Sequence, residues 1–203
     1  MNFPKYKVAY ISEDNYLADE EISDIKHEYF DGEIFAMSGG SVNHQRLTGN
    51  VFAALHHHLK GKPCEAFSSD MKVRADKGKK YFYPDVLVSC HNDDGNTHFS
   101  ESPHIIVEVL SDSTRKFDKN LKRQIYQSIP SLEEYVLIEQ DLVEIEVCRK
   151  SQNWQPTYYF IDDEITFTSI DLTLPVLEIY QRVDNQEMRH FLKTLEIKGN
   201  LPL

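Results

Sequence analysis

Two short apolar segments, each next to or containing one carboxylate, predict the centre of the fold. The first segment, Val86 to Val88, directly follows Asp85 and is typical of a buried strand. The second segment, Ile105 to Leu110, predicts another buried strand with Glu108 in its middle. Side chains alternate along a strand, and both faces of this one are apolar, so Glu108 has no evident solvent side. An unpaired carboxylate there costs roughly several kcal/mol, so we expect Glu108 to be paired, protonated or bound to a cation.

Two interpretations of these carboxylates are open from the sequence. In the first, Glu108 forms an ordinary salt bridge. In the second, Asp85 at the start of one strand and Glu108 in its neighbour converge on one hard cation. Mg²⁺ suits this second interpretation because it often takes only one or two protein carboxylates and completes its shell with waters and phosphate oxygens.

The segment that follows predicts an amphipathic helix with two stripes. The apolar stripe consists of Phe117, Leu121 and Ile125, and is expected to be buried. The second stripe, one residue on, consists of Asp118, Lys122 and Tyr126. Lys122 therefore lies at the border of the buried face, either as a surface lysine whose stem covers apolar groups or as a partner of the carboxylates.

Residues 27 to 37 predict a β-hairpin that turns at Asp31-Gly32. We expect the apolar residues Tyr29, Ile34 and Phe35 to be buried. The hairpin also carries Glu28, whose simplest interpretation is a solvent-facing residue.

A helix is predicted from about Asn43 to Leu59 and a strand from Cys64 to Arg74. His44 lies at the helix start, where backbone N–H groups favour an anion. Either a DNA phosphate contact or a structural cap explains it. Asp70, within the predicted strand, is more simply a turn residue than a metal ligand.

The C-terminal half has further alternating segments. A strand from Glu134 to Glu139 and a partner over residues 143 to 147 are predicted. Residues 158 to 167 suggest another hairpin, turning at Asp162-Asp163. A short helix is expected over residues 188 to 195.

Several of these residues form motifs that resemble those of a known family. In chain order the motifs are Tyr83-Pro84-Asp85, Glu108-Val109-Leu110-Ser111, and Ser113-Thr114 with Asp118, Lys122 and Tyr126. The similarity extends upstream through His27 to Gly40 and His44, and downstream through Leu132 to Leu137, so that it covers about residues 16 to 180. The chain resembles the Uma family of candidate endonucleases, within the PD-(D/E)XK nuclease superfamily.

The resemblance implies an α/β fold of the restriction endonuclease-like type. The expected αβββαβ core is a mixed central sheet flanked by helices, with an additional N-terminal hairpin and C-terminal β-hairpins. One domain is expected over residues 1–203, with an N-terminal extension to about residue 26 and a tail from about residue 184.

The resemblance also implies an active site. Asp85 and Glu108 would hold Mg²⁺ or Mn²⁺, with help from the main-chain carbonyl of Val109. The lysine that the superfamily carries two residues after the glutamate is replaced here by Leu110. Lys122, from the following helix, matches the relocated lysine of this family, and Asp85, Glu108 and Lys122 are the predicted catalytic residues. The predicted supporting or substrate-binding residues are His44, Asp118 and Tyr126.

The net charge of −11 argues against tight nonspecific binding of DNA, because phosphate contacts require basic groups. Screening makes local charge matter more than the total, and basic groups occur at residues 72 to 80 and 115 to 123. DNA therefore stays the predicted partner, and a homodimer, which would let an endonuclease address both strands, is expected from the fold alone.

No apolar run approaches the ~20 residues of a membrane span, and the first ten residues lack a signal-peptide core. These features predict no membrane partner and a cytoplasmic location. The three cysteines, Cys64, Cys90 and Cys148, are widely spaced and are expected to be reduced thiols.

Three functions fit the sequence. A metal-dependent DNA endonuclease is the leading hypothesis. The alternative, motivated by the acidic composition and the missing strand lysine, is a catalytically inactive nuclease fold used as a binding or assembly module. Hydrolysis of another phosphate ester is a third possibility, since the site chemistry does not identify its substrate.

Overall fold

The computed structural model describes residues 10–90 and 97–197. The first nine residues, where the sequence predicts no signal-peptide core, lie outside this description. No helix within the described segments is long and apolar enough to cross a bilayer.

The central sheet has six strands in the order β11-β10-β9-β8-β6-β3. These strands are β3 (Glu65–Ser68), β6 (Val86–Ser89), β8 (Pro103–Leu110), β9 (Glu134–Glu139), β10 (Ile145–Arg149) and β11 (Pro156–Tyr159). β8 and β9 are parallel and the other neighbours are antiparallel, so the sheet is mixed as predicted. The strands expected over Val86 to Val88, Ile105 to Leu110 and Glu134 to Glu139 are all present.

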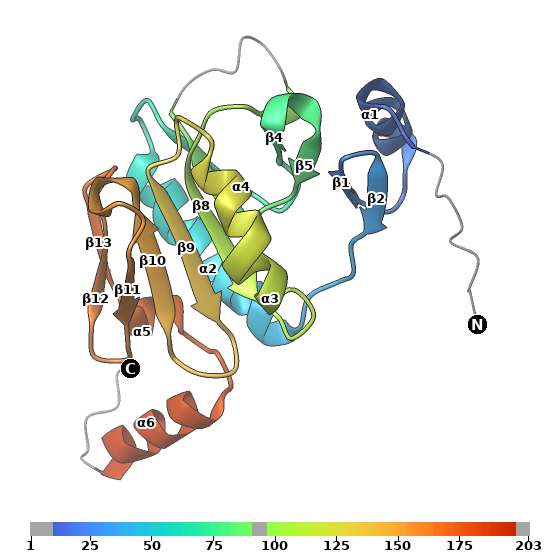
Figure 1. Cartoon of the computed structure of the whole chain (residues 1–203). Helices are drawn as coiled ribbons and strands as arrows, with labels where there is room; N and C mark the ends of the chain where they lie inside the picture. Colours follow the sequence, from blue (N-terminus) through green and yellow to red (C-terminus); the bar gives the residue numbers. More distant parts are fainter. Residues whose placement is uncertain (1–9, 91–96, 198–203) are drawn as a thin grey trace, which may run out of the picture.

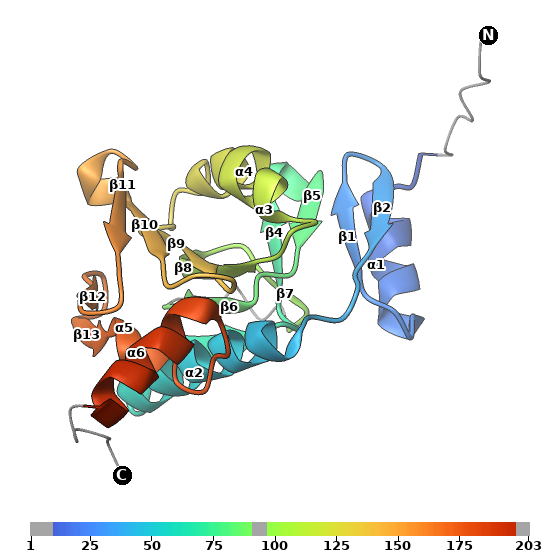
Figure 2. The same ribbon diagram turned by 90° about the horizontal axis from the view of Figure 1, so that it is seen from below.

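Helices cover both faces of this sheet (Figure 2). On one face lies α2 (Val42–Leu59), whose N-cap is the Ser41 side chain. On the other face lies a continuous segment of α3 (Arg115–Phe117), the π-helical turn η2 (Asp118–Lys122) and α4 (Arg123–Gln127). Alternation along β8 sends its odd-numbered residues into the α2 core and its even-numbered ones toward α4. Glu108 therefore faces the side that carries Lys122.

A second, five-stranded sheet stands beside the first, in the order β2-β1-β5-β4-β7 (Figure 1). Its strands are β1 (His27–Phe30), β2 (Glu33–Ala36), β4 (Lys72–Ala75), β5 (Lys80–Phe82) and β7 (Phe99–Ser100), and α1 (Glu13–Ile22) packs on it. The predicted hairpin is present as β1 and β2. The burial predicted for Ile34 and Phe35 is wrong, because β2 is the edge strand and only Tyr29 enters the core between α1 and β5.

The strand predicted from Cys64 to Arg74 is also wrong. It is divided at Ser69, whose φ of 44° ends β3, and the chain then enters β4 of the second sheet. Asp70 lies in this turn and forms an ion pair with Lys26, in agreement with the turn interpretation. The chain returns to the central sheet between β5 and β6, so Asp85 lies where the two sheets meet.

The C-terminal part contains β12 (Glu164–Phe167), β13 (Leu172–Pro175), α5 (Val176–Ile179) and α6 (Gln186–Ile197). The hairpin predicted to turn at Asp162-Asp163 is wrong: β11 pairs with β10, whereas β12 pairs with β13. The helix expected near the end of the chain is present as α6.

The prediction of three reduced thiols is wrong for two of them. Cys64 and Cys90 form a disulfide, and Cys148 is free and buried. Glu65 of β3 pairs with Ser89 of β6. Cys64 and Cys90 adjoin this pair at the same end of the two strands, so they lie opposite each other. Sequence spacing did not reveal this contact because it depends on strand register.

Reduction of this disulfide is expected to lower the free energy of unfolding by about 3 kcal/mol, since the bond closes a loop with a sequence separation of 26. Urea unfolding with and without dithiothreitol measures the difference. The Cys64→Ser/Cys90→Ser variant is the control and should show no response to the reductant. Equal stability of the oxidised and reduced wild type would contradict the prediction.

Candidate active site

Asp85 directly precedes β6, and Glu108 lies on β8, the antiparallel neighbour of β6. Val86 pairs with Val107, so the register places Asp85 beside Glu108. Asp85 is fixed there because its Oδ2 accepts a hydrogen bond of 2.7 Å from the main-chain N–H of Val109. The two carboxylates predicted as metal ligands are therefore brought together.

Lys122 joins them from the helix. Its Nζ lies 2.9 Å from Oε1 of Glu108, 2.9 Å from Oε1 of Glu28 and 3.7 Å from Oδ1 of Asp118. Glu108 has an ammonium as its ion-pair partner, and no arginine is paired with it in the described chain. The three predicted catalytic residues thus meet in one place.

The π-helical turn η2 explains how two charged residues of one helix reach the sheet. Asp118 and Lys122 begin and end this turn, and both are buried. The burial predicted for Leu121 as part of the apolar stripe is wrong, because 43% of its surface is exposed. A π-turn inserts one extra residue and rotates the following side chains, which brings the polar stripe inward; such turns often occur at functional sites.

Tyr126 is fully buried, and its hydroxyl donates a hydrogen bond of 3.1 Å to Oε1 of Glu108. Its ring and that of Phe82 lie 5.8 Å and 5.3 Å from Nζ of Lys122. Tyr126 thus orients Glu108, and its ring makes a cation–π contact with the ammonium of Lys122. A phosphate contact, one of its expected roles, does not fit its burial.

His44 approaches the site from the N-terminal turn of α2. Its Nε2 lies 3.3 Å from Oδ2 of Asp85, whereas the cap of the helix is Ser41. The structural-cap interpretation of its side chain is therefore wrong. Its Nδ1 is buried and has no hydrogen-bond partner among the described residues.

The cluster contains four carboxylates, those of Glu28, Asp85, Glu108 and Asp118. Against them stand the ammonium of Lys122 and the imidazole of His44, so full ionisation leaves at least two negative charges in excess. This excess is unusual in a largely buried place.

Burial and the neighbouring charges shift several pKa values in the cluster. Burial, opposed by Lys122, raises the pKa of Glu108 well above its ordinary value. Burial also raises the pKa of Asp118. For Lys122 burial acts downward, but the surrounding groups, Glu108 foremost, outweigh it and raise the pKa well above the ordinary value. For His44 too, the desolvation is outweighed by Asp85, and the pKa is raised. Each of these shifts favours the protonated form of its group.

The donors present fit a hard divalent cation. Asp85 and Glu108 supply carboxylate oxygens on adjacent strands, and the excess negative charge would be offset by Mg²⁺ or Mn²⁺. No group of three or more histidine, cysteine, aspartate or glutamate residues suited to a metal occurs within residues 10–90 and 97–197. A site built on Asp85 and Glu108 would be sparse, and waters and substrate oxygens would supply the remaining ligands of Mg²⁺.

Sequence reasoning missed Glu28, which was interpreted as solvent-facing. The burial of Tyr29 in the alternating strand β1 does send its neighbour Glu28 to the opposite face. The sequence alone gave no sign that this face turns toward Lys122, because that depends on how the second sheet joins the first.

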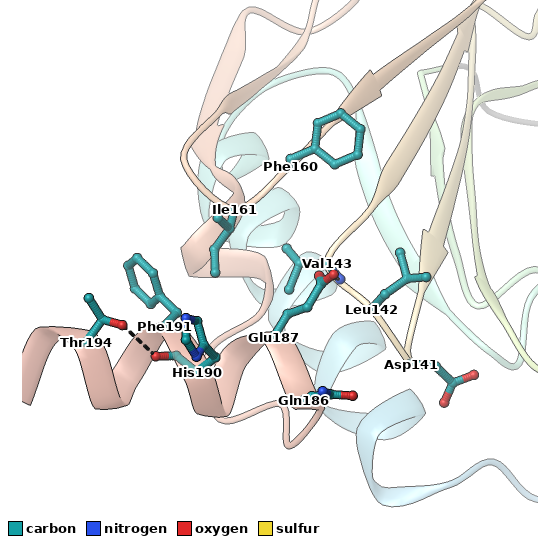
Figure 3. Close-up of a pocket in the computed structure, with 10 residues that line it drawn as sticks. All are labelled: Asp141, Leu142, Val143, Phe160, Ile161, Gln186, Glu187, His190, Phe191 and Thr194. Atoms are coloured by element: carbon teal, nitrogen blue, oxygen red, sulfur yellow. Dashed lines mark hydrogen bonds between the residues drawn. The ribbon is translucent and has the colours of Figure 1, made fainter.

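A cavity of about 840 Å³ lies elsewhere, between α6, the β9–β10 turn and the β11–β12 loop (Figure 3). Apolar side chains such as Leu142, Phe160 and Phe191 line it together with His190 and Glu187. None of the predicted site residues contributes to it, so this cavity and the charged cluster are separate features.

The fold matches the "Crystal structure of a putative nuclease belonging to DUF820 from Anabaena variabilis ATCC 29413" with a TM-score of 0.66 and 18% identity, over 84% of this chain and 97% of that one. This likeness confirms the predicted class, a mixed α/β nuclease-like fold.

The sequence gives the family. The model of the Uma2 family, "Putative restriction endonuclease", matches residues 13–183. Two proteins of Synechocystis sp. (strain ATCC 27184 / PCC 6803 / Kazusa) are similar to the chain. "Uncharacterized protein slr1290" is 37% identical over 182 residues, which are 88% of this chain and 93% of that protein. "Uncharacterized protein sll1609" is 39% identical over 138 residues, which are 66% of this chain and 78% of that protein. The chain belongs to the Uma2 family, as its motifs indicated, and α6 lies beyond the matched region.

Proposed function

We propose that the protein is a metal-dependent endonuclease that hydrolyses phosphodiester bonds in DNA. Asp85 and Glu108 would hold Mg²⁺ or Mn²⁺, and Lys122 would act beside them on the substrate. The observation that carries the proposal is the meeting of these three groups in a cluster with excess negative charge. Membership of the Uma2 family supports the same reaction class.

Each group has a distinct role in this proposal. When bound, the cation would lower the pKa of a coordinated water and offset charge on the scissile phosphate. Lys122, held protonated, would orient the attacking oxygen or stabilise the negative charge that develops at phosphorus. Tyr126 keeps Glu108 in position, and His44 keeps Asp85 in position or contacts a DNA phosphate. Asp118, four residues before Lys122, lies 3.7 Å from its ammonium and supports its charge.

The acidic composition is compatible with DNA as a substrate that binds weakly. The net charge of −11 opposes phosphate binding at long range, and the bound cation would reverse this locally. We therefore expect cleavage that depends strongly on metal concentration and falls with added salt.

The test is cleavage of supercoiled plasmid DNA by the purified wild type with Mg²⁺ or Mn²⁺. Nicked and linear products are expected with metal, and none in the presence of EDTA. Calorimetric titration with the metal alone, without DNA, gives an independent measurement. Absence of cleavage together with absence of metal binding at millimolar concentration would contradict the proposal.

A binding or assembly module without turnover is the second candidate. The observation that favours it is Leu110, a buried apolar residue where the superfamily carries its lysine. This candidate predicts that DNA or protein binding persists in EDTA and that no product appears at any metal concentration.

A homodimer is part of the proposal. The edge strand β2 pairs only with β1 among the described residues, and its side chains Ile34 and Phe35 are exposed. Such an edge can pair with a second copy. The Phe35→Lys variant is expected to sediment as a monomer where the wild type sediments as a dimer; a monomeric wild type would contradict this arrangement.

We also propose a cytoplasmic location. The disulfide between Cys64 and Cys90 is uncommon in that compartment. Alkylation of thiols at cell lysis, followed by mass spectrometry, would show whether the bond exists in the cell.

A further inference from the structure

We propose that Glu28 is a positioning residue that holds Lys122 in its catalytic orientation, so that the β1–β2 hairpin completes the active site. This inference rests on the proposed nuclease function for its catalytic consequence. The contact itself is independent of that function. No motif that identified the site from sequence assigned a role to this hairpin.

The contact is direct and directional. Nζ of Lys122 donates a hydrogen bond of 2.9 Å to Oε1 of Glu28. The same carboxylate oxygen also accepts the main-chain N–H of Tyr83 at 3.4 Å, two residues before Asp85. Glu28 therefore bridges the helical segment that carries the lysine and the β5–β6 connection that carries Asp85.

Burial shows which side of the ammonium Glu28 occupies. The side chains of Lys122, Glu108 and Asp118 are 6%, 6% and 4% exposed, whereas that of Glu28 is 18% exposed. Glu28 is thus the carboxylate on the solvent side of Lys122. Without it, the ammonium would be free to turn outward toward water, where a charged group is better solvated.

The hairpin is well anchored for this task. Tyr29, next to Glu28, packs in a core with Tyr16 and Tyr81, with ring centroids 4.8 Å and 6.2 Å away. At the turn of the hairpin, the main-chain N–H of Asp31 donates a hydrogen bond of 2.7 Å to the carbonyl of Lys79, directly before β5. A residue supported in this way can keep a partner within the fraction of an ångström that positioning demands.

The chemical consequence concerns the direction of the lysine. In the proposed site Glu108 would share its charge with the cation, so the ammonium would depend more on its other partners, Glu28 and Asp118. Glu28 would keep Nζ beside Glu108, where the proposed function requires the ammonium. Loss of Glu28 should therefore reduce turnover more than it reduces DNA or metal binding.

Turnover of the full chain tests the catalytic part. We expect kcat to fall in the order wild type, Glu28→Gln, Glu28→Ala, with a loss of about 10- to 100-fold for alanine and with KM and half-saturating Mg²⁺ unchanged. In a Lys122→Met background the same Glu28 substitutions should have no further effect, because Glu28 acts through the lysine. Glu33→Gln, on the exposed strand of the same hairpin, is the matched control and should behave as wild type.

Chemical labelling tests the contact without any activity. Acetylation of Lys122 by acetic anhydride, followed by mass spectrometry, should be about tenfold faster in Glu28→Ala than in wild type and Glu33→Gln. An unchanged labelling rate would overturn the inference. So would an equal loss of kcat with and without Lys122, which is the signature of a merely structural role. If the wild type does not cut DNA, the proposed function fails, and the labelling result still decides whether Glu28 holds Lys122.

Discussion

Glu108→Gln is expected to lower the rate of DNA cleavage by about 10³-fold or more, while the metal-free variant unfolds with the same free energy as the wild type to within about 1 kcal/mol. The rate falls because an amide replaces one of the two carboxylates proposed to hold the cation. The fold survives because the amide oxygen can still accept the hydrogen bond from Tyr126. Lys122 also retains Glu28 and Asp118 as partners.

The sign of the stability effect follows from the raised pKa of Glu108. A carboxyl group whose folded pKa exceeds its unfolded value stabilises the fold below the unfolded value, and this contribution is lost as the pH rises through the folded value. Near neutral pH, ionisation of the buried Glu108 costs stability. The neutral glutamine avoids this cost, which offsets the loss of the ion pair with Lys122. Metal binding to the wild type should accordingly strengthen as the pH rises, since the bound form requires the ionised carboxylate.

Plasmid cleavage, metal calorimetry and urea unfolding measure these effects together. Glu178→Gln, an exposed position on α5, is the control for the substitution itself. Wild-type cleavage by Glu108→Gln would remove Glu108 from the metal site. Loss of both cleavage and folding would show instead that the carboxylate serves the fold.

The strands that carry Asp85 and Glu108 could be predicted from the sequence because both faces of each are buried. Continuous apolar runs with short polar boundaries give a local signal that tertiary contacts do not alter. The burial of both faces also made Glu108 conspicuous, since a carboxylate in such a run needs a partner. The resemblance then supplied Lys122, which local pattern alone would have left as a surface residue.

The features that sequence missed are those that depend on how separate elements meet. Glu28 faces the site only because β1 belongs to a second sheet, and Cys64 meets Cys90 only through the register of β3 and β6. Leu121 is exposed because a π-helical turn displaces the expected stripe, and an i, i+4 pattern contains no sign of an inserted residue. Strand order, register and helix irregularity are set by packing over long sequence separations.

Lys122→Met is expected to be the most destabilising single substitution in the cluster, lowering the free energy of unfolding at neutral pH by about 3–5 kcal/mol. Methionine fills a similar space beside Phe82 and Tyr126, so the loss is electrostatic. It leaves Glu28, Glu108 and Asp118 without the one ammonium that lies among them. DNA cleavage should also be lost, by about 10²-fold or more, because no other cation of the chain is paired with Glu108 in the described residues.

The pH dependence distinguishes this mechanism from simple loss of packing. The pKa of Lys122 is raised in the folded protein. Its stabilising contribution is therefore complete at any pH below the ordinary lysine pKa and is lost only as the pH rises through the folded-state pKa. The wild type thus has the full contribution at neutral pH. In Lys122→Met the unpaired carboxylates can be relieved by protonation instead. The difference between variant and wild type should therefore shrink as the pH falls toward about 5, because the raised pKa of Glu108 favours uptake of a proton there.

Urea unfolding from pH 5 to pH 8 measures that difference, with Lys116→Met, an exposed lysine of the same helical segment, as the matched control. Added Mg²⁺ gives a further discrimination, because a cation that binds at Asp85 and Glu108 should restore more stability to the variant than to the wild type. A deficit that is constant with pH and insensitive to Mg²⁺ would mean that Lys122 acts through packing. In that case the excess negative charge of the cluster would no longer argue for a bound metal.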